Sequence, residues 1–184
     1  MRGKIRITAS KSMYIYFAVM LLLVPLRWIL ALVISAALHE VFHLIVIRTM
    51  GIGVHSLRIG ISGAEIETEL MNPRQELLCA LAGPACGFCL LPVAKWMPEI
   101  SLCAIFQSLY NLIPVYPADG GRALRCGMGL LLSEMKADRV CRVIEVLVLG
   151  GFLLTGIYGT FCLGLGYLPL AFACVIVWGS RKKK

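Results

Sequence analysis

Long apolar runs separated by short polar stretches dominate the chain. The first run covers residues 13–50 and is broken mainly by Arg27 and by one cluster of two histidines and a glutamate. As a single helix these 38 residues would measure about 57 Å, nearly twice the thickness of a bilayer core. We therefore expect two membrane crossings with a turn near Pro25. A cleaved signal peptide is the alternative for this end, and the second apolar run that follows at once disfavours it.

The main polar interruption, residues 51–74, has the alternation of β-strands. Leu57, Ile59 and Ile61 alternate with polar or small residues, and residues 64–70 repeat the pattern. A period of two is typical of strands with two different faces. We expect a short β-hairpin over about residues 55–70, with its turn at residues 62–63 and an edge that receives an extended substrate segment.

Further apolar runs predict the remaining crossings. They lie at residues 75–96, 101–116, 143–158 and 161–178, with a basic stretch around residues 122–142 between the second and third. Together with the first run, they indicate about six transmembrane helices.

Composition explains where so many apolar residues go. Hydrophobic residues make up 59% of the chain, against about 45–50% in soluble domains, and the mean hydropathy is +0.85. A soluble fold of this size has no interior large enough, so the excess must face lipid. The expected fold class is an all-α polytopic membrane protein with a small membrane-associated β-hairpin. We expect one domain over residues 1–184, with its core at about residues 30–125 and C-terminal helices at about residues 139–179.

The positive charges follow the topology of a membrane protein. With six crossings and both ends inside, all Lys and Arg residues except Arg27 and Lys95 fall on the inner side. Cytoplasmic loops are enriched in Lys and Arg, so we expect a multi-pass protein of the cell membrane whose N- and C-termini are cytoplasmic. The net charge of +8 is not arranged as a basic stripe with interleaved aromatics, so nucleic acid is not an expected partner.

The cluster in the first run is His39-Glu40-Val41-Phe42-His43. Residues four apart share one face of a helix, so both imidazoles can reach one ion, and zinc suits these ligands. Glu40 is rotated by about 100° and can act as general base on the attacking water. Charged residues are costly inside a membrane, so the cluster indicates a site rather than a packing patch. His55 lies in the polar stretch, where we expect a surface role.

A third ligand is expected from a later segment. Asn111, Pro114, Pro117, Asp119 and Gly120 follow one another at short spacing at the end of an apolar run. The prolines cannot donate backbone hydrogen bonds, so the helix must open here. Irregular backbone at membrane depth is tolerated where it lines a protein cavity, and Asp119 is the acid placed there. We expect it near the inner end of the fourth crossing, at the depth of His43.

The two motifs together resemble the site-2 protease family of intramembrane zinc metalloproteases. Leu81-Ala82-Gly83-Pro84 resembles a further element of that family, and the short chain is similar to its compact branch, which includes the sporulation-processing protease. The chain departs from the family pattern at Gly87, where asparagine is common, and at Gly63-Ala64, where Gly-Gly is common. Gly83 and Gly87 also have the spacing of close helix packing, a structural role that we prefer to a catalytic one.

The resemblance implies a function and a set of roles. The family hydrolyses peptide bonds within or next to transmembrane segments of membrane-anchored substrates. His39, His43 and Asp119 would bind one zinc ion per chain, Glu40 would activate water, and Asn111, Pro114 and Pro117 would contact the substrate. The sequence shows no PDZ or nucleotide-sensing module, so regulation would come from a separate membrane protein or be absent. A metal-ion transporter and a catalytically inactive membrane scaffold are the alternatives; neither paired inverted repeats nor a lost ligand points to them.

Overall fold

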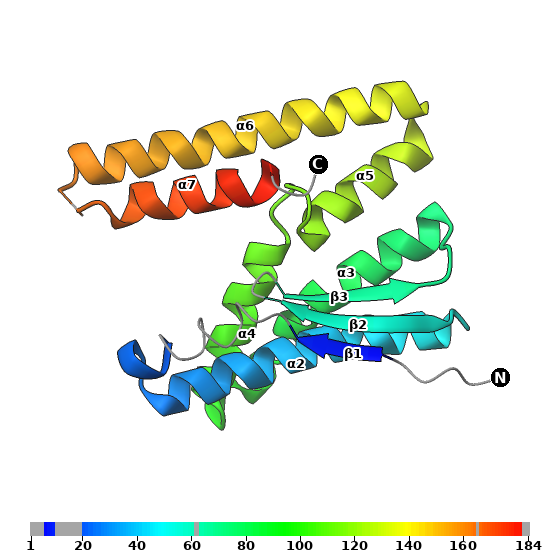
Figure 1. Cartoon of the computed structure of the whole chain (residues 1–184), viewed down its shortest axis with the longest axis horizontal. Coiled ribbons are helices and arrows are strands. Elements are labelled where there is room, and N and C mark those ends of the chain that lie inside the picture. Colours follow the sequence, from blue (N-terminus) through cyan, green and yellow to red (C-terminus); the bar gives the residue numbers. More distant parts are fainter. Residues whose placement is uncertain (1–5, 10–19, 61–62, 165, 182–184) are drawn as a thin grey trace. The chain divides into compact units, whose positions relative to one another are not determined.

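The computed structural model describes residues 6–9, 20–60, 63–164 and 166–181 (Figure 1). The chain divides into two compact units, residues 1–111 and 112–184. Each unit has its own helical core.

Three helices form the core of the first unit. They are α2 (Leu26–Thr49), α3 (Pro73–Cys89) and α4 (Pro98–Asn111), and a short 3-10 helix, η1 (Leu91–Lys95), connects the last two. Asn72 caps α3, because its side chain accepts a hydrogen bond from the Gln75 backbone while the Gln75 side chain accepts one from the Asn72 backbone. Each of the three helices packs against the other two. The buried face of α2 recurs at intervals of four residues and includes both motif histidines.

The predicted hairpin is present in the first unit. Strands β2 (Val54–Gly60) and β3 (Gly63–Thr68) pair antiparallel, ending at Gly60 opposite Gly63. Gly63 is therefore the first residue of β3, so placing it in the turn was wrong by one position. A third strand, β1 (Arg6–Ala9), pairs parallel with β2, which makes β2 the central strand. The sequence did not predict β1, because basic residues interrupt the apolar positions of the N-terminal segment.

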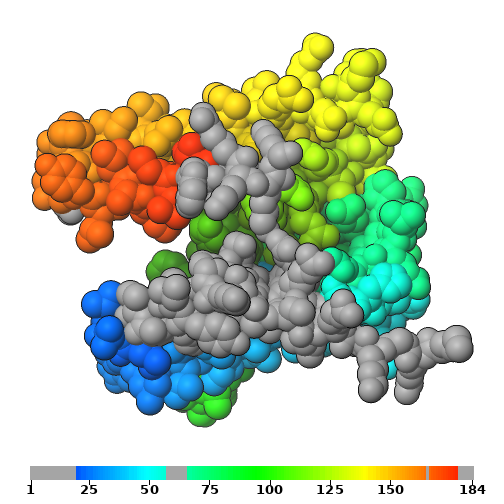
Figure 2. Space-filling view, in the orientation of Figure 1, coloured from blue at the N-terminus to red at the C-terminus, as the bar shows by residue number. Residues whose placement is uncertain are grey.

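The second unit consists of α5 (Asp119–Leu131), α6 (Glu134–Phe161) and α7 (Leu168–Arg181). Helix α5 falls in the stretch that the sequence marked only as basic. Its buried residues are small, while Arg122 and Arg125 are more accessible, so it has two different faces. Helices α6 and α7 lie side by side, and their side chains touch in the space-filling view, in yellow to red (Figure 2). A Cβ at Gly156 of α6 would lie 3.0 Å from the Ala173 Cβ of α7, so the helices approach closely there.

The helices confirm the polytopic all-α fold class. Within the described ranges, three segments are long and apolar enough to cross a membrane: Leu26–Thr49, Pro73–Lys95 and Glu134–Phe161. The fourth and sixth expected crossings correspond to the shorter helices α4 and α7. Most of the first expected crossing lies outside the described residues. Many large apolar side chains are exposed, including Leu30, Leu154 and Phe161, as expected of helices that face lipid.

Candidate metal centre

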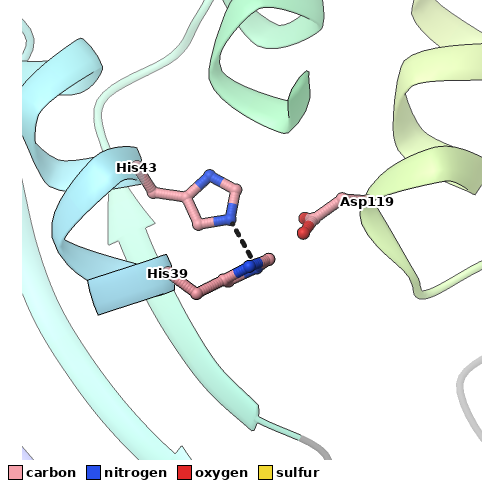
Figure 3. Close-up of side chains that lie close together, drawn as sticks. All are labelled: His39, His43 and Asp119. Carbon is pink, nitrogen blue, oxygen red and sulfur yellow. Dashed lines mark hydrogen bonds between the residues drawn. The ribbon is translucent and has the colours of Figure 1, made fainter. Parts of the chain in front are cut away.

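His39 and His43 lie on consecutive turns of α2 and face the interior of the first unit. Their exposed fractions are 4% and 5%. The ring centroids are 4.9 Å apart at an interplanar angle of 77°, and the two Nε2 atoms are 3.3 Å apart (Figure 3). The four-residue spacing brings the rings together because it returns nearly to the same side of the helix.

This geometry fits zinc. Two nitrogens that each bind a tetrahedral zinc at about 2.0–2.1 Å are about 3.3–3.4 Å from one another. The two Nε2 atoms already have that separation, 3.3 Å. Imidazole is a common zinc ligand, and the metal would lie beside both Nε2 atoms without a change in the helix.

A backbone carbonyl of α3 orients His43. The His43 Nδ1 atom lies 2.7 Å from the Cys79 carbonyl oxygen, which can only accept. Nδ1 therefore carries the proton, and Nε2 presents its lone pair on the side of His39. A metal-binding histidine is usually fixed in this way by a hydrogen bond from its other nitrogen. No residue type marks this partner along the chain, because every residue has a backbone carbonyl group.

Gly83 of α3 lies directly against the two histidines. A Cβ at this position would collide with the His43 Nε2 atom and would lie 2.5 Å from the His39 Nε2 atom. The missing side chain thus keeps the space beside both nitrogens open. The expected packing role of Gly83 is thus present, and the packing partners are the two histidines of the candidate centre. Gly87 also has the expected packing role, since a Cβ there would lie 2.5 Å from the Ala104 carbonyl oxygen of α4.

Asn111 is the last residue of α4 and reaches the same place. Its side-chain Nδ2 atom lies 3.4 Å from the His39 Nε2 atom. The helix ends here, as predicted from the prolines that follow. Of the predicted site residues, the structure thus brings His39, His43 and Asn111 together within the first unit. Glu40, next to His39 on α2, is partly buried, and His55 of β2 is exposed, as expected of a surface residue.

The remaining predicted site residues belong to the second unit. Asp119, which Figure 3 also labels, is the first residue of α5, and its carboxylate lies 3.8 Å from Arg122 one turn later. An acid at a helix N-terminus is stabilised by the helix dipole. Pro114 and Pro117 are partly buried in the segment that leads into α5.

The glycines after Asp119 allow this segment to fold back tightly. A Cβ at Gly120 would collide with the Leu112 carbonyl group, and one at Gly121 would lie 2.6 Å from the Tyr116 backbone nitrogen. Both glycines are helical, so they serve the close approach of this segment to the start of α5 rather than a turn.

Comparison with known proteins gives sequence and structural relatives. No family model matches the sequence. A candidate zinc metalloprotease of Synechocystis sp. is 30% identical over 120 residues, which cover 53% of this chain and 32% of the relative. A zinc metalloprotease of Methanocaldococcus jannaschii is 26% identical over 123 residues, covering 59% of this chain and 36% of the relative. The chain spans about a third of the length of these curated relatives.

A solved structure shows the fold. A site-2 protease from Methanocaldococcus jannaschii superposes with a TM-score of 0.65 at 20% identity, covering 92% of this chain and 84% of that chain. The resemblance predicted from the motifs is confirmed in the fold and in the similarity to zinc metalloproteases. The three membrane-length apolar helices support the membrane location.

Proposed function

We propose that this chain, which has the fold of the site-2 proteases, is an intramembrane zinc metalloprotease that hydrolyses peptide bonds within or next to transmembrane segments of membrane-anchored substrates. The observation that carries the proposal is the pair of buried imidazoles on a membrane-length helix, with Nε2 atoms at the spacing of a tetrahedral zinc site. Polar groups inside an apolar membrane helix are energetically costly, so their presence indicates a functional site.

The proposed ligands of one zinc ion per chain are His39, His43 and Asp119. A catalytic zinc has three protein ligands and one open position, and two histidines leave it one ligand short. Together with them, Asp119 makes a set of two imidazoles and a carboxylate, which suits zinc. The proposal also treats the two units as one protease domain.

Zinc, when bound, supplies a Lewis acid that makes water nucleophilic and polarises the substrate carbonyl. The Glu40 carboxylate accepts the proton of the attacking water and then delivers it to the leaving amine nitrogen. The Asn111 amide, already beside the His39 Nε2 atom, donates a hydrogen bond to the carbonyl oxygen as negative charge develops there. Pro114 and Pro117 hold the neighbouring backbone open for the substrate.

The substrate segment must be extended before hydrolysis, because a helix shields its own peptide bonds. Strand β3 supports a strand-addition mode, since the sheet order is β1-β2-β3 and one side of β3 pairs with β2. Ile59 of β2 pairs with both Ala9 and Ala64, so it lies inside the sheet rather than at an edge. We propose that the extended substrate pairs with β3. Both termini of the chain are proposed to lie in the cytoplasm, and a separate membrane protein is proposed to regulate the activity.

The test is purification in detergent followed by metal analysis and incubation with a panel of single-span membrane substrates. We expect about one zinc per chain and cleavage in or beside the span, abolished by a chelator and restored by added zinc. Zinc binding without cleavage of any substrate would favour the inactive scaffold. Zinc flux into sealed vesicles without cleavage would favour the transporter.

A further inference from the structure

A row of buried polar groups continues from the metal centre along α2 and α4. Ser35 lies one turn before His39 on α2, and Gln107 lies one turn before Asn111 on α4. Ser35 is 1% exposed, although its neighbours along the helix are apolar. The two contacts, Ser35 with Gln107 and His39 with Asn111, form what we call the polar ladder.

The first contact of the ladder is a hydrogen bond between side chains. The Ser35 hydroxyl oxygen lies 3.3 Å from the Gln107 Oε1 atom and 2.9 Å from the Leu32 carbonyl oxygen. A hydroxyl has one proton to donate, so it serves one acceptor at a time. When Leu32 accepts it, the Gln107 amide can rotate and donate its own N–H to the Ser35 oxygen. Ser35 and Gln107 thus remain bonded in either arrangement.

The spacing links the two contacts of the ladder. Both helices separate them by four residues, about 6 Å along each axis. Apolar and small residues let membrane helices approach but tolerate small sliding and rotation, whereas a hydrogen bond is directional. If α4 slid along α2, the Gln107 amide would leave Ser35 and the Asn111 amide would leave His39 at the same time.

We propose that Gln107 is a positioning residue that, through its bond to Ser35, holds the Asn111 amide beside the metal centre. Gln107 lies one turn before Asn111 on α4, so it acts on the metal centre through Asn111. Its catalytic consequence rests on the proposed function, because Asn111 stabilises the developing charge there. A misplacement of about 1 Å in a catalytic site can reduce the rate a hundredfold, so a loosened Asn111 is expected to lower kcat about tenfold.

The first test compares kinetics and metal content. Gln107→Met keeps the volume but removes the amide, and Ser35→Ala removes the other half of the same bond. Both should lower kcat about tenfold at nearly unchanged KM and with full zinc content. The double variant Gln107→Met/Asn111→Ala should be no slower than Asn111→Ala alone, because Gln107 acts through Asn111. A full kcat in both single variants, or losses that multiply in the double variant, would overturn the inference while the protease function stands.

The second test reports on Asn111 without catalysis. The chain has two asparagines, Asn72 and Asn111, and two glutamines, Gln75 and Gln107. Protein labelled with 15N-asparagine should therefore give two pairs of side-chain NH2 signals by NMR, one pair for each asparagine. Gln107→Met should shift the Asn111 signal and leave that of Asn72. The matched control Gln75→Met should do the reverse, since Gln75 and Asn72 form the cap of α3.

The two tests distinguish failure of the positioning role from failure of the proposed function. An Asn111 signal unchanged in both Gln107→Met and Ser35→Ala would disprove the positioning role, whatever the activity. If the wild-type protein binds no zinc and cleaves no substrate while the Asn111 signal shifts as expected, the proposed function fails and the positioning role survives as a property of the fold.

Discussion

The two long helices α2 and α6 are both apolar enough to cross a membrane, but they bury different kinds of residue. In the middle of α2, Ser35, His39 and His43 are buried. Near the C-terminal end of α6, the buried residues are Gly156 and Gly159, and large side chains such as Leu154 are exposed; Glu145, closer to the middle, is also buried. The middle of α2 thus buries a row of polar groups, whereas the end of α6 that packs on α7 buries glycines.

The difference shows where function can be sought in a membrane protein. A glycine face lets α7 approach α6 and needs no partner for hydrogen bonding. A buried polar face is stable only if each group finds a partner, and α2 finds them on α3 and α4: Cys79, Gln107 and Asn111. Such groups are retained despite their cost, which indicates chemistry rather than packing.

The largest expected effect comes from Glu40 on α2, the helix that buries polar groups. Glu40→Gln keeps the size of the side chain but cannot accept a proton, so cleavage should fall by about 10²–10⁴-fold. Zinc content should be unchanged, because both histidines remain. The measurements are the rate of substrate cleavage and the metal content of purified protein. The matched control is Glu99→Gln at the start of α4, which should cleave normally; near wild-type cleavage by Glu40→Gln would exclude its role as base.

Asp119→Ala tests whether the second unit completes the site. Removing a residue that hydrogen-bonds to a metal ligand already lowers metal affinity about 10–100-fold. Removing a ligand itself should therefore lower zinc affinity about a hundredfold or more. Activity should fall with zinc content, and Asp119→Glu should retain part of both. Asp138→Ala, which removes an exposed acid of α6, is the control. Full zinc occupancy in Asp119→Ala would mean that another residue closes the site.

Gly83→Ala tests the space beside the histidines. The added methyl group would lie within contact distance of both Nε2 atoms, so the imidazoles must move apart or rotate. Zinc affinity and activity should both fall about 10–100-fold, the range seen when a ligand loses its orientation. Metal titration and cleavage rates measure the effect. Tight zinc binding in this variant would show that the Nε2 atoms adapt and that the open space is not required.

Ile66→Pro tests the edge of β3 that faces away from β2. Along an antiparallel hairpin, hydrogen-bonded residue pairs alternate with pairs that are not hydrogen-bonded. Gly60 and Gly63 close the hairpin as a hydrogen-bonded pair, so the Leu57–Ile66 pair is not hydrogen-bonded. The Ile66 N–H therefore points away from β2. Proline there removes a donor to an added strand without breaking the β2–β3 ladder. One hydrogen bond is worth about 1 kcal/mol, so cleavage should fall about five- to tenfold with zinc unchanged. Ile66→Ala is the control, and equal turnover in the two variants would contradict substrate binding at this edge.

The sequence predicted the features that repeat along the chain or restrict the backbone. The alternation at residues 55–70 predicted the hairpin, the His39-to-His43 spacing predicted the facing imidazoles, and the prolines after Asn111 predicted the end of α4. It missed features that depend on a distant partner. The Cys79 carbonyl, the Gly83 contact and the Ser35–Gln107 bond have no local signal, because only packing of α3 and α4 on α2 creates them.

The smallest expected effect is that of Gly150→Ala on α6, the same substitution as Gly83→Ala at a position that borders open space. A Cβ at Gly150 would have no atom within 4 Å. Alanine is favoured over glycine in a helix interior by about 0.5–1 kcal/mol, so thermal unfolding in detergent should be unchanged or slightly later. Zinc content and cleavage should equal those of the wild type. If Gly150→Ala reduced zinc affinity as much as Gly83→Ala, the effect of Gly83→Ala would reflect general destabilisation. The contrast between the polar groups of α2 and the glycines of α6 would then not indicate where the metal binds.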